Sequence, residues 1–241
     1  MPSLPGGFFI TLEGLDGSGK TTQAQLLAAR LRADGWPVTL TYEPGGTELA
    51  DRVRALLLSS DLRWLPWSQL HLILAARHDH VERVIRPALA AGQIVLCDRF
   101  TDSTLAYQGY GQGLDLVEIE QAHRTVVRDC FPDLTLLYDL DPEQALQRVA
   151  ARHHLTLEPL PDGRFVYARP AFVPPDPGLG LFPVPDLSFY QRVRTGYLQL
   201  VQAAPHRFYV LDASQDTHTL AHQTWHVIHR KLAGLSHPTE D

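Results

Sequence analysis

A glycine-rich segment at residues 14–21, with the sequence GLDGSGKT, constrains the fold of this chain more than any other feature. It fits the pattern G-x-x-x-x-G-K-[ST] of a phosphate-binding loop, which is informative only between a strand and a helix. The apolar run at 8–12 predicts a buried strand before the loop. Leu27 and Leu31, with several alanines, predict a helix after it. We therefore expect the fold to be built around a strand–loop–helix unit.

The residue types of this loop suit the binding of a polyphosphate. Gly14, Gly17 and Gly19 allow backbone N–H groups and the positive end of the following helix to approach an anion closely. Lys20 is expected to neutralise the β- and γ-phosphates, and the Thr21 hydroxyl is a potential ligand of Mg²⁺. The alternative is a turn that caps a helix and binds nothing. The predicted nucleotide contacts are Gly14, Gly17, Ser18, Gly19, Lys20, Thr21 and Thr22.

Length, charge and cysteine content limit the class of protein. The 241 residues suffice for one large α/β domain or a domain with a lid. A net charge of −6 argues against a nucleic-acid partner, which is usually bound by a basic surface. We expect no membrane span and no secretory signal, because the chain has no run of about 18 apolar residues and no basic segment before an apolar core. Cys97 and Cys130 are too few for a disulfide framework, which predicts a cytoplasmic location.

Predicted strands and helices alternate along the chain. Strands are predicted at 8–12, 36–42, 93–99, 133–139 and 208–211, with helical patterns between them. This order predicts a three-layer α/β fold, with a five-stranded parallel sheet flanked by helices, in a single domain over 1–241. The final helix is predicted at 217–233, followed by a frayed tail at about 234–241.

Three segments between the strands carry more specific expectations. The helix after Thr47 is expected to place Leu49, Val53, Leu56 and Leu57 on one apolar face. A helical region from about 67 to 91 is expected to bend near Pro87, and the polar, glycine-rich segment 101–113 to form a binding loop with a short helix. Residues 159–185 hold eight of the 18 prolines, which excludes a regular helix or a central strand. A long insert of this kind is usually functional, and we expect a lid over about 152–187.

Two positions point to a ligand at the carboxyl ends of the strands. Arg77 falls on the apolar stripe of its helix, which is costly for a cation without an anionic partner. Either Arg77 has a structural solution, with a carboxylate partner or a stem that reaches the surface, or its side chain points into a cleft toward a ligand. Asp98 and Arg99 end the strand at 93–99, and ligands of open parallel sheets bind outside such ends. Asp98 is therefore a candidate ligand of Mg²⁺ or of its waters, or alternatively a turn residue.

Several motifs together resemble the thymidylate kinases of bacterial type, within the P-loop nucleoside monophosphate kinases. They are EPGGT at 43–47, AAR at 75–77, DRF at 98–100, STLAYQG at 103–109 and DASQ at 212–215. The resemblance covers the chain from Phe9 to about Leu220. It implies a P-loop NTPase fold with a lid, and transfer of the γ-phosphoryl group of ATP to dTMP, giving dTDP and ADP for dTTP synthesis. It also implies ATP and Mg²⁺ as cofactors and a homodimer.

The resemblance implies roles for individual residues. Arg99 would hold the acceptor phosphate, Arg77 the thymine edge, Asp16 the 3′-hydroxyl, and Tyr107 would crowd a ribose 2′-hydroxyl. The implied dTMP site is Asp16, Glu43, Pro44, Ile73, Arg77, Arg99, Ser103, Thr104, Tyr107 and Gln108. Catalysis would fall to Asp16, Lys20, Arg99 and Arg152, metal binding to Thr21 and Asp98, and further ATP contacts to Arg148 and Ala213.

The chain departs from the family pattern at a few positions. Ile73 stands where a phenylalanine usually stacks on thymine, so an aliphatic surface would cover the base here. The loop's variable positions hold no basic residue, and bacterial-type members then supply arginines from the lid. Arg148 and Arg152 match the edge of that lid, and Arg164 and Arg169 are further candidates.

Three other functions remain open from the sequence. They are a kinase for another nucleoside monophosphate, a deoxynucleoside kinase with Glu43 as the base, and a nucleotide-binding protein without catalytic activity. Several histidines invite a metal-site interpretation, but His78 and His80 lie two residues apart on a helix and do not share a face. We therefore expect surface or packing histidines.

Overall fold

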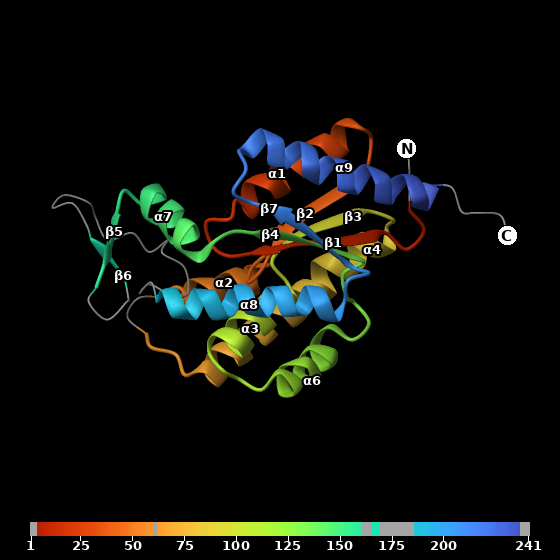
Figure 1. Cartoon of the computed structure of the whole chain (residues 1–241). Helices are drawn as coiled ribbons and strands as arrows, with labels where there is room; N and C mark the ends of the chain where they lie inside the picture. The colour runs from red at the N-terminus through yellow and green to blue at the C-terminus, as the bar shows by residue number, and fades with distance from the viewer. Residues whose placement is uncertain (1–3, 60–61, 161–164, 169–185, 237–241) are drawn as a thin grey trace.

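The computed structural model describes residues 4–59, 62–160, 165–168 and 186–236. Within this part of the chain, five strands form one parallel sheet (Figure 1). Their order across the sheet is β2 (Val38–Tyr42), β3 (Ile94–Asp98), β1 (Phe8–Gly14), β4 (Leu134–Asp139) and β7 (Phe208–Asp212). The predicted α/β class is confirmed. Because β1 is central, the loop that follows it opens at the middle of the sheet's carboxyl edge, where ligands of such folds bind.

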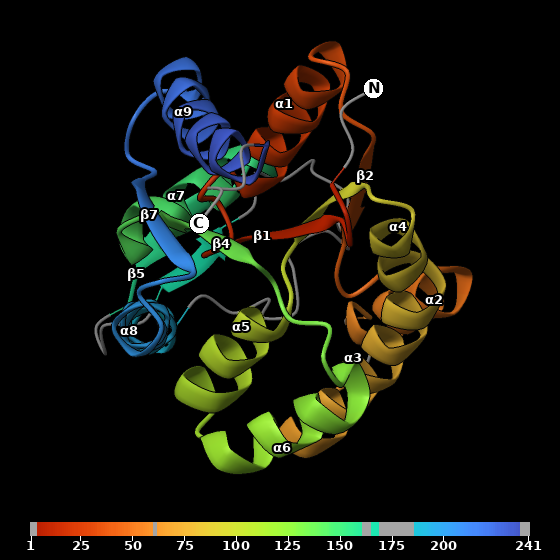
Figure 2. The ribbon, with the colours of Figure 1, turned by 90° about the vertical axis from the view of Figure 1, so that its right-hand side faces the viewer.

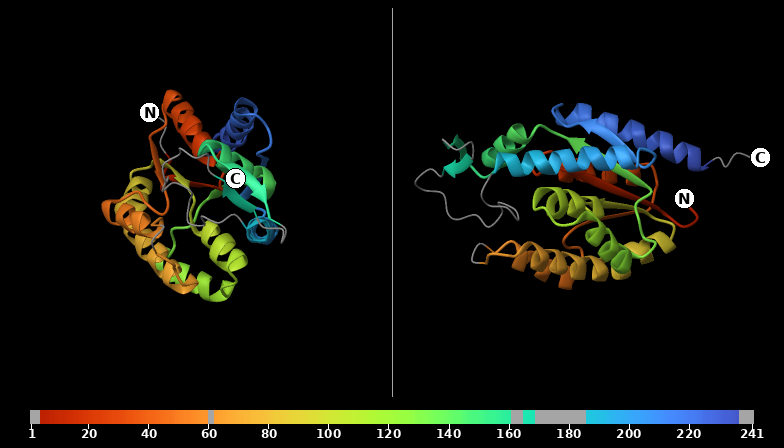
Figure 3. Two further views of the ribbon diagram at one scale, coloured as in Figure 1. Left: turned by 90° about the vertical axis from the view of Figure 1, so that its left-hand side faces the viewer. Right: turned by 60° about the horizontal axis from the view of Figure 1, so that its bottom comes forward.

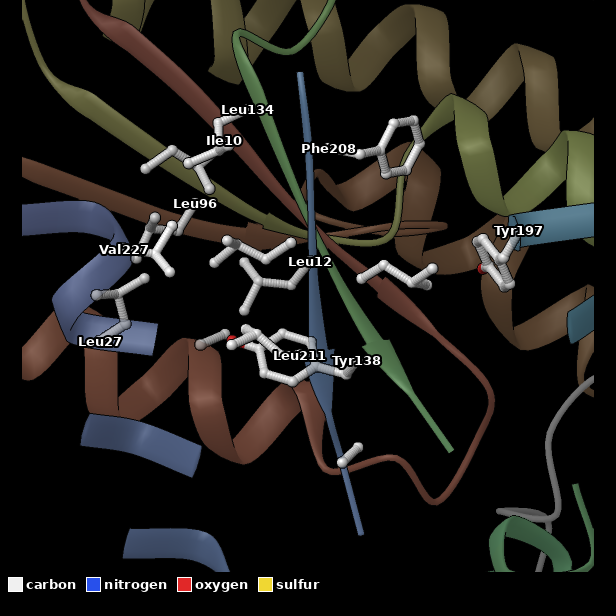
Figure 4. Packing of buried hydrophobic residues seen from close by; sticks show 14 of the residues in the cluster. Ile10, Leu12, Leu27, Leu96, Leu134, Tyr138, Tyr197, Phe208, Leu211 and Val227 are labelled. Carbon is white, nitrogen blue, oxygen red and sulfur yellow. The ribbon is translucent and has the colours of Figure 1, made fainter. Parts of the chain in front are cut away.

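Helices cover both faces of the sheet and bury its alternating side chains. The helices α1 (Lys20–Ala33) and α9 (Thr217–Ser236) lie on one face, and α8 (Leu187–Ala203), α3 (Pro66–His80) and α6 (Leu116–Val127) on the other (Figure 2). Ile10 and Leu12 of β1 pack among the side chains of α1 and α9 (Figure 4). Phe9 points the other way, into a cluster with Ile85 and Phe100. Successive side chains of β1 therefore pack on opposite faces of the sheet.

The helix after Thr47 differs from its prediction. Thr47 caps α2 (Glu48–Leu57) as expected, by accepting the N–H of Ala50. The predicted apolar face, however, is not buried as a unit: Leu57 is buried, whereas Leu49 and Leu56 are 49% and 42% exposed. Leu49 and Leu56 are seven residues apart and lie on the same side of the helix. α2 packs on α3 through a different side, so periodicity alone did not identify its buried face.

The two segments on either side of β3 are helical throughout. The helical region expected to be interrupted or bent near Pro87 is interrupted just before that residue, where α3 passes through the π-helical turn η1 (Val81–Ile85) into α4 (Arg86–Ala90). Proline has no N–H for the carbonyl four residues earlier, which favours such an interruption. Of the binding loop with a short helix predicted at 101–113, the short helix is present as α5 (Thr101–Thr104), but most of the loop is wrong, because α5 continues into a second π-helical segment, η2 (Leu105–Gly111). Gly109 and Gly111 serve packing there, since a Cβ at either would meet an apolar side chain of α6 or α8.

The region after β4 extends the molecule beyond the sheet. Asp141 caps α7 (Pro142–Arg152) as predicted, and a short antiparallel hairpin of β5 (Thr156–Pro159) and β6 (Phe165–Ala168) follows at the end of α7 (Figures 1 and 3). The sequence predicted an irregular insert and missed this hairpin. Residues 161–164 and 169–185, most of the predicted lid, lie outside the described residues. α9 continues to Ser236, so the predicted frayed tail is wrong at 234–236, and 237–241 are not described.

Among the described residues, none of the helices has the length and apolarity needed to cross a membrane.

Candidate active site

The loop between β1 and α1 has the backbone geometry of an anion-binding loop. Gly14, Gly17 and Gly19 all have positive φ angles, of 143°, 87° and 86°. Gly17 packs directly on α7, where a Cβ would lie 2.4 Å from the carbonyl oxygen of Ala145. Ser18 is buried, and its Oγ has no hydrogen-bond partner among the described residues. Thr22, on the first turn of α1, is exposed. A Cβ would not fit at Gly14 or Gly17, whereas Gly19 is required by its backbone conformation alone.

Lys20 and Asp16 lie at the mouth of this loop. Lys20 Nζ donates to the carbonyl of Leu15 at 3.2 Å and lies 3.7 Å from Asp16 Oδ1. Arg99 Nη2 donates to the same oxygen of Asp16 at 2.8 Å. Enclosure tends to raise the pKa of Asp16, but the charges of Arg99 and Lys20 outweigh it and hold that pKa below its ordinary value. Asp16 is therefore a carboxylate that links the loop to β3.

Thr21 and Asp98 meet beside Lys20, as the sequence predicted for a metal site. The Thr21 hydroxyl donates to Asp98 Oδ2, and Asp98 Oδ1 is buried without a hydrogen-bond partner among the described residues. An orphaned carboxylate oxygen beside a hydroxyl is a donor set that suits Mg²⁺, which prefers oxygen ligands and keeps several waters. The residues present fit the ion.

A cavity extends from Lys20 toward α7 and is called here the Lys20 cavity. It contains Asp16, Thr21 and Asp98, and Arg152 lines its far side. Its remaining lining residues are Ala24, Gln25, Leu40, Thr41, Tyr42, Glu43, Arg54, Arg99, Val149 and His153. Arg148, also on α7, donates instead to the carbonyls of Ala213 and Ser214, at 2.9 and 3.4 Å, and so connects α7 to the loop after β7. Ala213 itself is buried.

A second cavity, called here the Arg77 cavity, lies against α3, α5 and η2. Its lining holds all ten residues that the sequence assigned to dTMP, together with Arg54 and Leu58. The sequence missed these two, because no motif marks α2 and because the predicted buried face of that helix was wrong. The Arg77 cavity shares Asp16, Glu43, Arg54 and Arg99 with the Lys20 cavity, so the two adjoin.

Arg77 satisfies both alternatives that the sequence left open, since it is paired with a carboxylate and also lines a cavity. Its side chain is 2% exposed, and Nε donates to Glu43 Oε2 at 2.6 Å. Its Nη atoms donate to Thr104 Oγ1 and to the carbonyl of Phe100, at 3.0 and 3.1 Å. Burial favours protonation of Glu43, but Arg77 and then His80 outweigh it, so the pKa of Glu43 is lowered.

Two buried histidines extend this network, and the sequence did not single out either for it. His123 Nε2 lies 3.0 Å from Arg77 Nη1, which can only donate, so Nε2 accepts. Burial and then Arg77 lower the pKa of His123 well below its ordinary value, so the ring is neutral. His80 Nδ1 faces Glu43 Oε1 at 2.9 Å, and its Nε2 faces Thr41. These are packing histidines, and the described residues contain no cluster of three or more His, Cys, Asp or Glu suited to a metal.

Arg99 lies between the two cavities and has hydrogen-bond partners on several elements. Besides Asp16, its guanidinium donates to Ser103 Oγ at 2.9 Å and to Tyr107 Oη at 3.2 Å. Behind Ser103 are Glu13 of β1 and Tyr197 of α8, both fully buried. The sequence missed Glu13 because it lies inside an apolar strand pattern. It missed Tyr197 as well, since no motif marks its hydroxyl.

Comparisons with known proteins agree with this geometry. A family model described as thymidylate kinase matches residues 12–163. The thymidylate kinase of Syntrophotalea carbinolica is 43% identical over 219 residues, which are 90% of this chain and 93% of the relative. That of Deinococcus radiodurans is 45% identical over 91% of this chain and 95% of the relative. A crystal structure of thymidylate kinase from Ehrlichia chaffeensis superposes with a TM-score of 0.70 at 35% identity, covering 93% of this chain and 99% of that one. This chain belongs to the thymidylate kinase family.

Proposed function

We propose that this chain transfers the γ-phosphoryl group of ATP to dTMP, giving dTDP and ADP for dTTP synthesis. One observation carries the proposal: a cavity lined by Arg77, Arg99 and Tyr107 adjoins the cavity of the phosphate-binding loop, and the two share Asp16 and Arg99. Two adjoining sites with cations between them suit the in-line transfer of a phosphoryl group between two bound nucleotides.

On the acceptor side, the proposed roles follow the chemistry of the lining. Arg99 holds the phosphate of dTMP, and its guanidinium is already oriented by Ser103 and Asp16. Arg77 and Thr104 are the polar groups that face the thymine edge. Ile73 is 5% exposed and supplies an apolar wall for the base, with Pro44 and Gln108 around it. Tyr107 stands against the sugar and disfavours a 2′-hydroxyl.

On the donor side, the loop glycines, Ser18 and Thr22 surround the phosphates of ATP, and Lys20 neutralises charge on the transferred group. Arg148 and Ala213 lie on the adenine side, where they are joined by a hydrogen bond. Mg²⁺ would be held by Thr21 and Asp98, and when bound it neutralises charge on the phosphate oxygens. We expect Asp98→Asn to raise the Mg²⁺ concentration needed for half-maximal activity. An unchanged requirement would remove Asp98 from the metal site.

A lid over about 152–187 belongs to the same proposal, within a single domain. Arg152, which lines the Lys20 cavity at the end of α7, supplies positive charge to the transferred group, and closure excludes water so that ATP is not hydrolysed. Limited proteolysis tests this idea: a bisubstrate analogue should protect residues 155–185. Equal cleavage with and without the analogue would argue against a lid.

The chemistry of Glu43 argues against a deoxynucleoside kinase. Such an enzyme needs a carboxylate base near the 5′-hydroxyl, but both oxygens of Glu43 are engaged, by Arg77 and by His80. The lowered pKa of Glu43 makes it a weak base.

We further propose a cytoplasmic homodimer, since the exposed leucines of α2 form an apolar face that a second copy would cover.

The decisive experiment compares acceptors. ADP production with ATP and Mg²⁺ should be fastest with dTMP and far slower with dUMP, dCMP, AMP and thymidine. Equal turnover of several monophosphates would make the chain a broader nucleoside monophosphate kinase, and turnover of thymidine without dTMP would overturn the proposal. Absence of transfer to any acceptor would favour a nucleotide-binding protein without catalytic activity.

A further inference from the structure

Arg99 is held in a backbone conformation that the residue itself disfavours. Its φ angle is 73°, in the left-handed region that residues with a Cβ rarely adopt. Its N–H continues the sheet by donating to the carbonyl of Leu12 at 3.0 Å. The next N–H, that of Phe100, donates not to a strand carbonyl but to the side chain of Glu13, Oε1, at 2.7 Å. A side chain of β1 thus fixes the turn that presents Arg99.

The second oxygen of Glu13 supports the guanidinium of Arg99 through hydroxyl groups. Arg99 donates to Ser103 Oγ, and Ser103 Oγ in turn donates to Glu13 Oε2. Tyr197 Oη, on α8, donates to the same oxygen at 3.0 Å and lies 2.9 Å from Ser103 Oγ and 3.4 Å from Arg99 Nη1. Glu13 is fully buried and lines neither cavity. It therefore contacts no substrate directly and acts through the residues that it holds and through its charge.

We propose that Glu13 and Tyr197 are positioning residues that hold Arg99, through the Phe100 backbone and Ser103, in the conformation that binds the acceptor phosphate. This inference rests on the proposed function, since it takes Arg99 as the acceptor-phosphate residue. Three donors, the Phe100 N–H and the two hydroxyls, converge on one carboxylate, which has acceptors only. A glutamine offers one acceptor oxygen and an NH₂ group, so it cannot accept from all three partners, and it removes the negative charge near Arg99.

The charge of Glu13 is itself sensitive to pH near neutrality. Burial, and then the nearby Asp102, raise the pKa of Glu13 to about 7, against lowering by Ser103, Arg99 and the Phe100 N–H. Its hydrogen-bond partners and nearest charges are Ser103 and Asp102 of α5, Arg99 after β3 and Tyr197 of α8. Lys20 of α1, Cys97 of β3 and Arg207 before β7 also interact electrostatically with Glu13. Asp102 is itself paired with Arg207 by two hydrogen bonds of 2.7 Å. Protonation of Glu13 below about pH 7 removes one hydrogen-bond acceptor from the network. Binding of dTMP should therefore weaken more steeply with falling pH in the wild type than in a glutamine variant, in which only the phosphate of dTMP itself still titrates, at about pH 6.

Steady-state kinetics test the proposal. KM is measured for Glu13→Gln and for Tyr197→Phe, first with dTMP and then with ATP as the varied substrate. We expect Glu13→Gln to raise KM for dTMP at least about tenfold, since a positioning error of 1 Å can cost about 100-fold. KM for ATP should change much less, because the residues that Glu13 holds lie on the acceptor side. The part of the acid limb in kcat/KM for dTMP that comes from Glu13, near pH 7, should disappear, leaving the part that comes from the phosphate of dTMP at about pH 6. Tyr197→Phe keeps the ring and removes one hydroxyl, so it should raise KM for dTMP by a smaller factor.

The matched control is Tyr138→Phe, which removes an equally buried tyrosine hydroxyl whose partner is Thr224, with no link to Arg99. It should leave both KM values unchanged. If Glu13→Gln does not fold, the comparison of KM for dTMP between Tyr197→Phe and Tyr138→Phe tests the positioning role. The positioning role would be overturned if KM for dTMP stayed unchanged in both Tyr197→Phe and Glu13→Gln, or if KM rose equally for dTMP and for ATP. Neither result would contradict the dTMP kinase activity of the wild type. A wild type that does not use dTMP would instead overturn the proposed function.

Discussion

At the scale of single residues, the site is organised around charges that are buried and paired. Arg77 and Glu43 are each 2% exposed in their side chains, and the guanidinium is held by four partners. Removing one partner of such a pair leaves a buried charge without compensation, which costs more than the pair contributes. The geometry of the site is therefore tied to the stability of the fold at this position.

Arg77→Leu should lower the free energy of unfolding by about 3–5 kcal/mol, because Glu43 would remain buried without its main partner. The chain offers a matched control in Arg83, whose Nε donates to Asp79 at the same 2.6 Å but on an exposed surface. Arg83→Leu should change stability little, since water screens exposed pairs. Urea unfolding of the three proteins measures the difference, and equal losses in the two variants would contradict the role of burial.

The raised pKa of Glu13 gives the fold a defined pH dependence. The folded chain holds this proton up to about pH 7, whereas the unfolded chain releases it near the ordinary value of 4.5. The folded state therefore binds more protons between these two values, so the contribution to stability is complete below 4.5 and is lost as the pH rises through 7. Its size is on the order of 3 kcal/mol.

Comparison of the wild type with Glu13→Gln isolates this contribution, because the other titrating groups are common to both proteins. The free energy of unfolding of the wild type, relative to that of the variant, should fall as the pH rises from 4.5 to 7 and then level off. Urea unfolding at a series of pH values measures it. A difference that stays constant, or that grows with pH, would show that Glu13 titrates at its ordinary value.

At the scale of elements, the phosphate-binding loop and α7 depend on each other. Gly17 packs on the backbone of Ala145 in α7, and the same helix carries Arg148 toward Ala213 and Arg152 toward the Lys20 cavity. The close approach at Gly17 therefore sets the distance between the loop and the arginines of α7. Gly19 needs its positive φ for the turn into α1, but it has no neighbour within 4 Å of a Cβ.

Two alanine substitutions separate these requirements. Gly19→Ala should cost only the left-handed strain of a residue with a Cβ, about 1–2 kcal/mol. Gly17→Ala should cost clearly more, because the new Cβ would also push α7 away from the loop. Urea unfolding without nucleotide gives both values. Equal losses would mean that α7 yields freely and that the close contact does not constrain it.

At the scale of the whole molecule, the proposed homodimer would bury the exposed leucines of α2. Leu49 and Leu56 lie on one side of the helix, away from the core, and no other described element covers them. The double variant Leu49→Asp with Leu56→Asp should shift a dimer to a monomer of 26.9 kDa by light scattering. Leu26→Asp, at a leucine of α1 that is 41% exposed, is the control and should stay dimeric. If the double variant remained dimeric, α2 would not form the dimer interface.

Much of the fold and of the candidate site followed from the sequence. Local patterns determined the five strands of the parallel sheet, the α/β class, the phosphate-binding loop and the cap of α7, because each depends on residues close together along the chain. The motif resemblance also assembled the ten residues that line one cavity, without showing how they touch. The structure differs from the predictions in most of 101–113, at the hairpin of β5 and β6, at 234–236 and in the exposure of the apolar face of α2. At 101–113 and on α2, neighbouring helices and not local periodicity decide conformation and burial.

Only the tertiary structure decided how buried charges are shared. Glu13 lies in an apolar strand and Tyr197 in the apolar stripe of α8, so neither carries a local signal of function. They meet at Arg99 because β1, β3, α5 and α8 converge at one edge of the sheet, across as many as 184 positions of sequence. The sequence thus determined which chemical groups this chain can bring to a phosphate. The packing of distant elements determined which carboxylate holds which cation, since a buried charge is stable only where the fold supplies its partner.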